Sequence, residues 1–159
     1  PCGSGYGADL LKTFGIIYEG IDRDPVALEY ARRLYGSNKA SFRVGDLTAP
    51  NLDAGRYDTI ACIEGLEHIE REYQDPLIAA FQAALKPGGT LIISSPENPT
   101  GKSDRSIYHK HHLWELNRAD FLELLHKHFP PQAVEIVTHR AVLSSGVLTT
   151  CLYGICHKD

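Results

Sequence analysis

The stretch that decides the fold stands at the start of the chain: Cys2-Gly3-Ser4-Gly5-Tyr6-Gly7-Ala8. Its glycines permit a tight turn and a close approach of a ligand to the backbone, and the helix expected after them presents unpaired N–H groups. We therefore expect a ligand with a polar or negatively charged end at Gly3, Ser4, Gly5 and Gly7. The same letters satisfy the GxGxxA pattern of dinucleotide-binding proteins, and a plain loop is a third interpretation.

Outward from this turn, the apolar pattern predicts that helices and strands alternate along the chain. The predicted strands are residues 16–21, 42–44, 57–63, 90–95, 133–137 and 147–155. The predicted helices follow the glycine turn, Asp24 and Asn117, and a further one covers residues 78–85. Alternation indicates an α/β fold with a Rossmann-like, doubly wound and mainly parallel sheet. Two successive strands at the end indicate that the last one is antiparallel.

Length and composition favour one domain over residues 1–159, since 43% hydrophobic residues can build a continuous core. A glycine turn of this kind normally follows the end of a buried strand, and here the chain opens at Pro1 directly in the turn. The sequence also contains no methionine. We therefore expect that the first strand is missing and that the domain is truncated at its N-terminus.

The net charge, the cysteine spacing and the length of the apolar runs argue against several classes of protein. The formal net charge of −4 gives no broad attraction for nucleic acid, which favours a basic face. The four cysteines lack the CxxC spacing of a zinc site, so we expect reduced thiols. Apolar runs are too short for a membrane span and the N-terminus has no signal-peptide pattern. These features predict a cytoplasmic protein without a membrane span.

Acidic residues stand at the ends of successive predicted strands. Asp22 comes roughly 20 residues after the glycine turn, where a carboxylate can accept both hydroxyl hydrogens of a ribose. Asp46 ends the next strand and Glu64 the one after it. Because the carboxyl ends of parallel strands open on one edge, we expect these acids in one ligand-binding crevice. A helix-capping or solvated role is the alternative for Asp22 alone.

The ordered series CGSGYGA, GIDRDPVALEYAR, FRVGDLTAP, YDTIACIEGLEHI and LKPGGTLIISSPEN resembles the motif set of class I S-adenosylmethionine-dependent methyltransferases, of the type 11 and 12 kind. The resemblance implies that Gly3 to Gly7 line the methionine end of the cofactor and that Asp22 binds the ribose. It further implies that Asp46 and the backbone of Leu47 read the adenine edge. Arg23 departs from the family, which usually has an apolar residue packing on the adenine face.

A second group of polar residues is Glu64, Glu67 and His68, spaced as neighbours on one face of a helix. Two carboxylates and an imidazole can hold Mg²⁺ or Mn²⁺, with a fourth ligand from the unpatterned, histidine-rich loop over residues 96–113. The alternative is a helix start whose acids favour its positive end.

The run ExxEH, followed by HHLWELNRADF, is similar to Hen-type RNA 3′-terminal 2′-O-methyltransferases. That resemblance implies a metal held by Glu64, Glu67, His68 and His112. The ExxEH element is also similar to that of ubiquinone-biosynthesis O-methyltransferases. We therefore expect S-adenosylmethionine-dependent O-methylation of a small molecule, with His68 and His112 as catalytic residues and Glu64 also at the cofactor site.

Three alternatives remain at this stage. They are an RNA methyltransferase, an NAD-binding oxidoreductase and a non-catalytic nucleotide-binding module. The oxidoreductase interpretation uses the glycine turn and Asp22 but gives no role to Asp46 or ExxEH. The sequence leaves the acceptor and the oligomeric state open, because fold-level resemblance does not fix a substrate.

Overall fold

The computed structural model describes residues 1–142 and 148–159. These residues form two compact units, Pro1–Asn51 and Leu52–Asp159, and each is described by itself. The first residue of the strand predicted at 147–155 lies outside the described residues.

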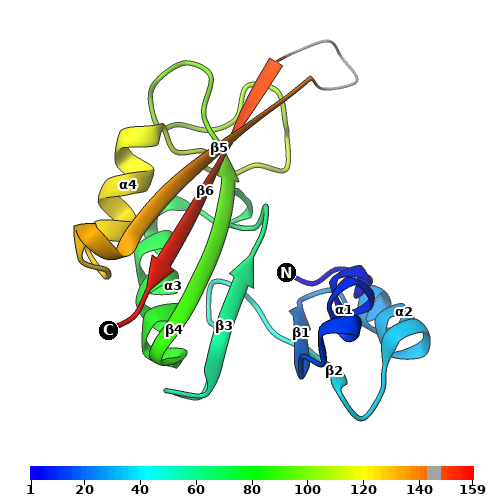
Figure 1. Cartoon of the computed structure of the whole chain (residues 1–159). Helices are drawn as coiled ribbons and strands as arrows, with labels where there is room; N and C mark the ends of the chain where they lie inside the picture. The colour runs from blue at the N-terminus through cyan, green and yellow to red at the C-terminus, as the bar shows by residue number, and fades with distance from the viewer. Residues whose placement is uncertain (143–147) are drawn as a thin grey trace. The chain divides into compact units, whose positions relative to one another are not determined.

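The first unit is a βαβ arrangement preceded by a short helix. Helix α1 (Tyr6–Leu11) and the 3₁₀ turn η1 (Lys12–Phe14) come before strand β1 (Tyr18–Asp22), helix α2 (Pro25–Tyr35) and strand β2 (Ala40–Val44) (Figure 1). Strands β1 and β2 pair in parallel, as the alternation of strand and helix predicts.

Helix α2 begins as its sequence predicts. The Asp24 side chain accepts hydrogen bonds from the backbone N–H groups of Val26 and Ala27, and Pro25 occupies the first helical position. The core of the unit is small and consists of Ala8, Leu28, Ala31 and Phe42. Leu10 on α1 and Phe14 on η1 are not part of this core, since Leu10 is 54% and Phe14 76% exposed.

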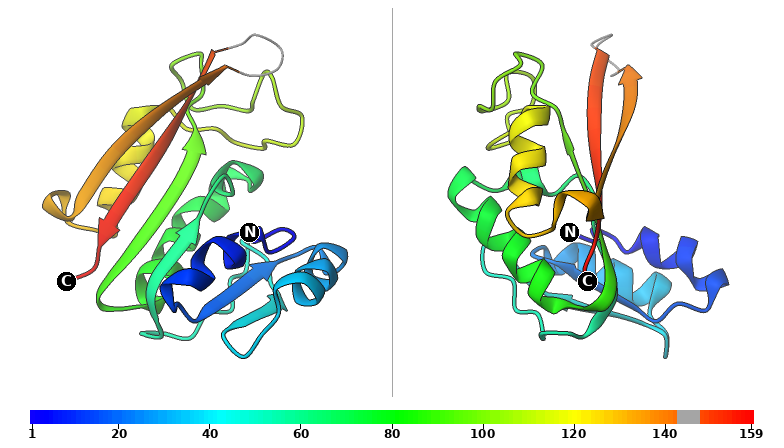
Figure 2. Two further views of the ribbon diagram at one scale, coloured as in Figure 1. Left: turned by 45° about the vertical axis from the view of Figure 1, so that its right-hand side comes forward. Right: turned by 60° about the vertical axis from the view of Figure 1, so that its left-hand side comes forward.

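The second unit is a four-stranded sheet covered on one face by two helices. Its sheet consists of β3 (Tyr57–Cys62), β4 (Leu85–Pro96), β6 (Leu148–His157) and β5 (Val134–Val142), in that order. Helices α3 (Arg71–Ala84) and α4 (Arg118–His126) lie side by side on one face (Figure 2, right). The 3₁₀ turns η2 (Leu66–His68) and η3 (Pro131–Ala133) complete the unit.

The strand directions agree with the sequence prediction. Strand β4 is parallel to β3, and β6 lies antiparallel between β4 and β5. The described residues therefore form a Rossmann-like α/β fold that is mainly parallel, with an antiparallel last strand. Among these residues, β1 and β3 each stand at an edge of their own sheet.

Several element boundaries differ from the prediction, among them the starts of α3 and β4 and the end of β5. Helix α3 begins at Arg71, seven residues before the predicted start at 78, and it contains Pro76. Burial of Gln74, Leu77 and Phe81 outweighs the hydrogen bond that the proline removes. The segment over 86–89, between the predicted helix at 78–85 and the predicted strand at 90–95, is an irregular part of β4 where the pairing register with β3 shifts.

The core of the second unit is mainly apolar, although it also buries polar side chains such as Glu67, Gln74 and Glu115. Helix α4 packs so closely on β6 that a Cβ at Gly154 would lie 2.5 Å from Leu125 Cδ1. Helix α4 starts after Asn117 as predicted, and the Asn117 side chain caps it by accepting a 2.9 Å hydrogen bond from Asp120 N. None of the helices in residues 1–142 and 148–159 combines the length and apolar character that a membrane span requires.

Candidate active site

The glycine turn and the end of β1 are joined by a hydrogen bond. Gly3 N donates to Asp22 Oδ2 at 2.7 Å, and Asp24 N donates to Asp22 Oδ1 at 3.0 Å. Asp22 is buried, with 9% of its surface exposed. Both oxygens keep further lone pairs, because a carboxylate offers about four acceptor positions. The structure therefore places Asp22 beside the turn with capacity for two more donors.

Gly5 makes the close approach of the turn possible. Its φ of 82° lies in the left-handed region, and a Cβ there would lie 2.7 Å from Ala31 Cβ and 2.8 Å from Phe42 Cε1. Only glycine fits both requirements without strain. Gly3 also has a positive φ of 52°, but a Cβ there would meet open space. Ser4 is exposed and Gly7 is half-buried beside Tyr18.

Asp46 lies at the same end of the two-stranded sheet as Asp22. In the parallel register Asp22 pairs with Val44, and Asp46 follows two residues later. Asp46 Oδ1 accepts hydrogen bonds from Thr48 N and Thr48 Oγ1, both at 2.8 Å. These two bonds hold the pKa of Asp46 below its ordinary value. The first unit thus presents the carboxyl groups of Asp22 and Asp46 at the carboxyl ends of its strands.

The remaining predicted cofactor residues of this unit flank the two acids. Arg23 directly follows Asp22 and is exposed, and its charge contributes to the lowered pKa of Asp46. Leu47 is half-buried beside Asp46. All the predicted cofactor-binding residues except Glu64 belong to the first unit.

Glu64 follows β3 in the second unit and is held by its neighbours. Its φ of 49° makes it the one non-glycine residue with positive φ among the described residues. Its backbone N–H donates to Ser94 Oγ at 2.9 Å, and that hydroxyl donates to Glu64 Oε1 at 2.7 Å. Cys151 Sγ also donates to Oε1. These contacts fix a strained conformation, a feature that often marks functional sites.

Glu67 is a buried carboxylate without a hydrogen-bond partner. The residue is 1% exposed, and neither of its carboxylate oxygens finds a donor among the described residues. Burial raises the pKa of Glu67 to about 8, and the negative charges of Glu64 and Glu115 add to the shift. Because unpartnered buried carboxylates are costly, this one requires a proton, a cation or a bound donor.

Two histidines lie beside Glu67. Ligand atoms of Glu67, His68 and His112 all lie within 4.8 Å of one another, and the rings of His68 and His112 meet edge to face at 5.0 Å. His68 Nδ1 lies 3.0 Å from the carbonyl oxygen of His111. The structure therefore brings three of the four predicted metal ligands together, while Glu64 stands outside this group and is bonded to Ser94 and Cys151.

Backbone hydrogen bonds hold the segment that follows His112 against Glu67, although His112 and Glu67 are 45 residues apart in the sequence. Glu67 O accepts hydrogen bonds from Leu113 N at 2.7 Å and Trp114 N at 3.3 Å. The buried Gln74 side chain, on α3, donates to Leu66 O at 3.0 Å and to Trp114 O at 3.1 Å. These bonds fasten the histidine-rich loop to η2 and to α3.

Sequence reasoning missed Glu115 in this cluster, whereas His109 belongs to the histidine-rich loop that was expected to supply a ligand. Glu115 is buried, and its Oε1 lies 2.6 Å from His112 Nδ1. The His109 ring stacks on the His112 ring at 4.6 Å between centroids. The spacing of three residues between His112 and Glu115 could have indicated this contact. The loop has no periodicity, however, that would predict where the Glu115 side chain points.

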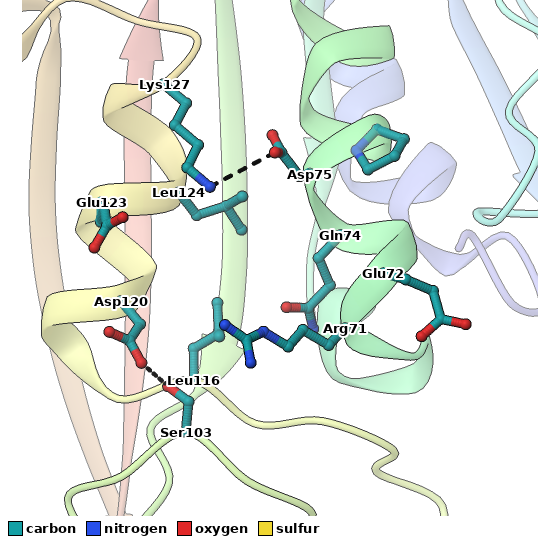
Figure 3. A pocket seen from close by; sticks show the side chains of 11 residues that line it. Arg71, Glu72, Gln74, Asp75, Ser103, Leu116, Asp120, Glu123, Leu124 and Lys127 are labelled. Atoms are coloured by element: carbon teal, nitrogen blue, oxygen red, sulfur yellow. Dashed lines mark hydrogen bonds and ion pairs between the residues drawn. The ribbon is translucent and has the colours of Figure 1, made fainter.

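A separate cavity of about 610 Å³ lies between α3 and α4. Figure 3 shows Arg71 and Lys127 at its two ends, with Lys127 paired to Asp75 and with Leu116 and Leu124 on its wall. None of the sequence-predicted site residues lines it. Its mixed charges indicate no particular ligand.

Comparison with known proteins identifies the family. Residues 1–93 match the family model described as "Methyltransferase domain". A probable S-adenosylmethionine-dependent methyltransferase of Mycolicibacterium smegmatis is 30% identical over 125 residues, 78% of this chain and 47% of that protein. The ubiquinone biosynthesis O-methyltransferase of Xanthomonas campestris is 36% identical over 101 residues, 59% of this chain and 40% of that protein.

A solved structure agrees with the fold. An S-adenosylmethionine-dependent methyltransferase from Methanosarcina mazei has a TM-score of 0.77 at 17% identity, covering 99% of this chain and 89% of that one. The chain belongs to the methyltransferase domain family, within the class I S-adenosylmethionine-dependent methyltransferases. It spans less than half the length of the two curated relatives, at 47% and 40%.

Proposed function

We propose that the protein transfers the methyl group of S-adenosylmethionine to a hydroxyl group of a small-molecule acceptor. The observation that carries this proposal is the group of Glu67, His68 and His112, which offers proton acceptors for a hydroxyl. Family membership supports S-adenosylmethionine as the methyl donor. Similarity to an enzyme named as a ubiquinone biosynthesis O-methyltransferase supports oxygen as the acceptor atom.

In this proposal the first unit binds the cofactor through carboxylates that accept hydrogen bonds from donor groups of the cofactor. The remaining acceptor positions of Asp22 take the two ribose hydroxyl hydrogens. Asp46, whose pKa is lowered, stays ionised at neutral pH and accepts from the adenine amino group. The turn from Gly3 to Gly7, with Ser4 exposed, lies against the methionine end, while Arg23 and Leu47 flank the base.

Methyl transfer is a displacement at the sulfonium carbon, with the acceptor oxygen in line with the leaving sulfur. The new C–O bond forms as the C–S bond breaks, and the acceptor proton must leave its oxygen. Positioning supplies much of the rate, and a histidine that takes the proton supplies a further factor of about 10² to 10⁴. His68 and His112 are the residues proposed for this step.

The alternative to proton transfer to a histidine is a divalent cation held by the same group. A buried carboxylate whose two oxygens accept no hydrogen bond from the described residues, beside two imidazoles, is a suitable donor set for Mn²⁺, and less so for Mg²⁺, which prefers oxygen ligands. Glu67, His68 and His112 would hold it, while Glu64 would stay bonded to Ser94. When bound, the cation would lower the pKa of a coordinated hydroxyl.

Calorimetric titration with S-adenosylhomocysteine and with NAD tests the cofactor. We expect binding of S-adenosylhomocysteine, and binding of NAD alone would exclude the proposal. Transfer of a labelled methyl group to phenolic and catechol acceptors tests the enzyme, and methyl transfer only to RNA ends would exclude a small-molecule acceptor. A protein that binds the cofactor but methylates no acceptor would be a binding module.

The role of the cluster is tested by His112→Ala and by chelation. We expect the variant to lose at least about 100-fold in kcat, the lower range for a lost acid–base group. His139→Ala is the matched control, because His139 is exposed on β5. Full activity of His112→Ala would remove the histidine from the mechanism, and full activity after chelation would remove the cation.

A further inference from the structure

Glu115 is a buried acid whose carboxylate is directed at one nitrogen of His112. Its Oε1 lies 2.6 Å from His112 Nδ1, and the side chains are 3% and 16% exposed. The backbone of Glu115 is fixed as well, because it pairs with Asp104 through two hydrogen bonds of 2.9 and 3.0 Å. The carboxylate is therefore held in place before any ligand arrives.

This contact decides which nitrogen of His112 carries the proton. An ionised carboxylate only accepts hydrogen bonds, so the proton of a neutral His112 ring must reside on Nδ1. Its Nε2 then carries a lone pair. Since Nδ1 is occupied by Glu115, Nε2 is the atom that His112 contributes to the group with Glu67 and His68.

We propose that Glu115 is a positioning residue that sets the tautomer and the orientation of His112. The proposal rests on the function proposed above only where it gives His112 Nε2 a role as a proton acceptor or as a cation ligand. A carboxylate behind the imidazole raises its strength both as a proton acceptor and as a cation ligand. Loss of such an outer partner typically costs about 10- to 100-fold in cation affinity or activity.

Two substitutions separate hydrogen bonding from charge. Glu115→Gln keeps an acceptor oxygen near Nδ1 but removes the charge, whereas Glu115→Leu removes both. Glu135→Gln is the control, because Glu135 is exposed on β5. Circular dichroism and a thermal melt of each variant establish that it is folded, and Glu115→Gln keeps the test available if Glu115→Leu does not fold.

The first measurement is ¹⁵N–¹H correlation spectroscopy of the histidine rings in metal-free protein near pH 8, where histidines are mostly neutral. We expect His112 to be protonated on Nδ1 in the unsubstituted protein, in Glu115→Gln and in Glu135→Gln. In Glu115→Leu we expect a mixture of tautomers. An Nε2–H tautomer in the unsubstituted protein, or an unchanged spectrum in Glu115→Leu, would overturn the proposal.

The second measurement is Mn²⁺ titration followed by electron paramagnetic resonance, with methyl-transfer kinetics alongside. We expect affinity to fall about 10- to 100-fold in Glu115→Leu and less in Glu115→Gln, and kcat to fall while KM for the acceptor stays nearly constant. Unchanged affinity together with unchanged kcat in Glu115→Leu would contradict the proposal. Absence of methyl transfer in the unsubstituted protein would refute the proposed function, while the tautomer measurement would still decide the role of Glu115.

Discussion

The backbone N–H of Gly3 donates a 2.7 Å hydrogen bond to Oδ2 of Asp22, so the glycine turn and the last residue of β1 form one fixed corner. A second bond, from Asp24 N to Oδ1, fixes the other oxygen. The carboxylate is thus oriented by the backbone, and its remaining lone pairs are available to a ligand.

Asp22→Asn is expected to weaken S-adenosylhomocysteine binding by about 10- to 150-fold, because hydrogen bonds to a charged group contribute roughly 1.5–3 kcal/mol. The amide also turns an N–H₂ group toward one of the two backbone donors. Calorimetric titration measures the change. Glu29→Gln, on the exposed side of α2, is the control and should bind normally. Equal affinity in the two variants would show that Asp22 is structural.

Gly5→Ala is expected to destabilise the first unit more than Gly3→Ala. Both positions have positive φ, which costs a residue with a Cβ about 1–2 kcal/mol. At Gly5 the methyl group would also meet Ala31 and Phe42 at 2.7 and 2.8 Å, and overpacking adds about 1–3 kcal/mol. Urea denaturation of both variants measures the difference, and similar midpoints would contradict the close packing.

Glu67→Met is expected to stabilise the metal-free protein by about 1–3 kcal/mol while abolishing methyl transfer. The substitution removes a buried carboxylate that has no donor among the described residues and fills the same space with an apolar chain. Thermal melts in the presence of a chelator and labelled-methyl assays provide the two readouts. A destabilised variant would reveal a partner that holds Glu67 in the folded protein.

Thr48→Val is expected to raise the pKa of Asp46, since it removes the hydroxyl donor and leaves the Thr48 backbone N–H in place. A lowered folded-state pKa contributes stability that is present above the unfolded pKa and is lost as the pH falls through the folded value. The variant should therefore lose this contribution at a higher pH during acidification. Carboxyl ¹³C titration by NMR measures the shift, and an unchanged Asp46 would assign the lowering to other groups.

Local sequence patterns predicted most of the fold. Asp24 before Pro25 and Asn117 before α4 mark helix starts because short polar side chains satisfy N–H groups of the first turn. The start of α3 could not be read in this way. It contains Pro76, and its extension depends on burial of Gln74 and Leu77 beneath neighbouring elements.

The candidate site, too, could be predicted only in part from the sequence. Spacing placed Glu67 beside His68, and resemblance suggested His112. The sequence could not show that the Glu64 carboxylate accepts hydrogen bonds from Ser94 and Cys151, which come from other strands. It also could not reveal Glu115, because contacts in an unpatterned loop depend on how the loop folds back.

By itself the sequence determined the succession of elements, the parallel pairing of β1 with β2 and the acids at strand ends. These follow from propensities and periodicities that act over a few residues. Tertiary structure alone decided which polar side chains meet. His112 lies beside Glu67 because Glu67 O accepts a hydrogen bond from Leu113 N, and no local pattern predicts a bond between segments 46 residues apart.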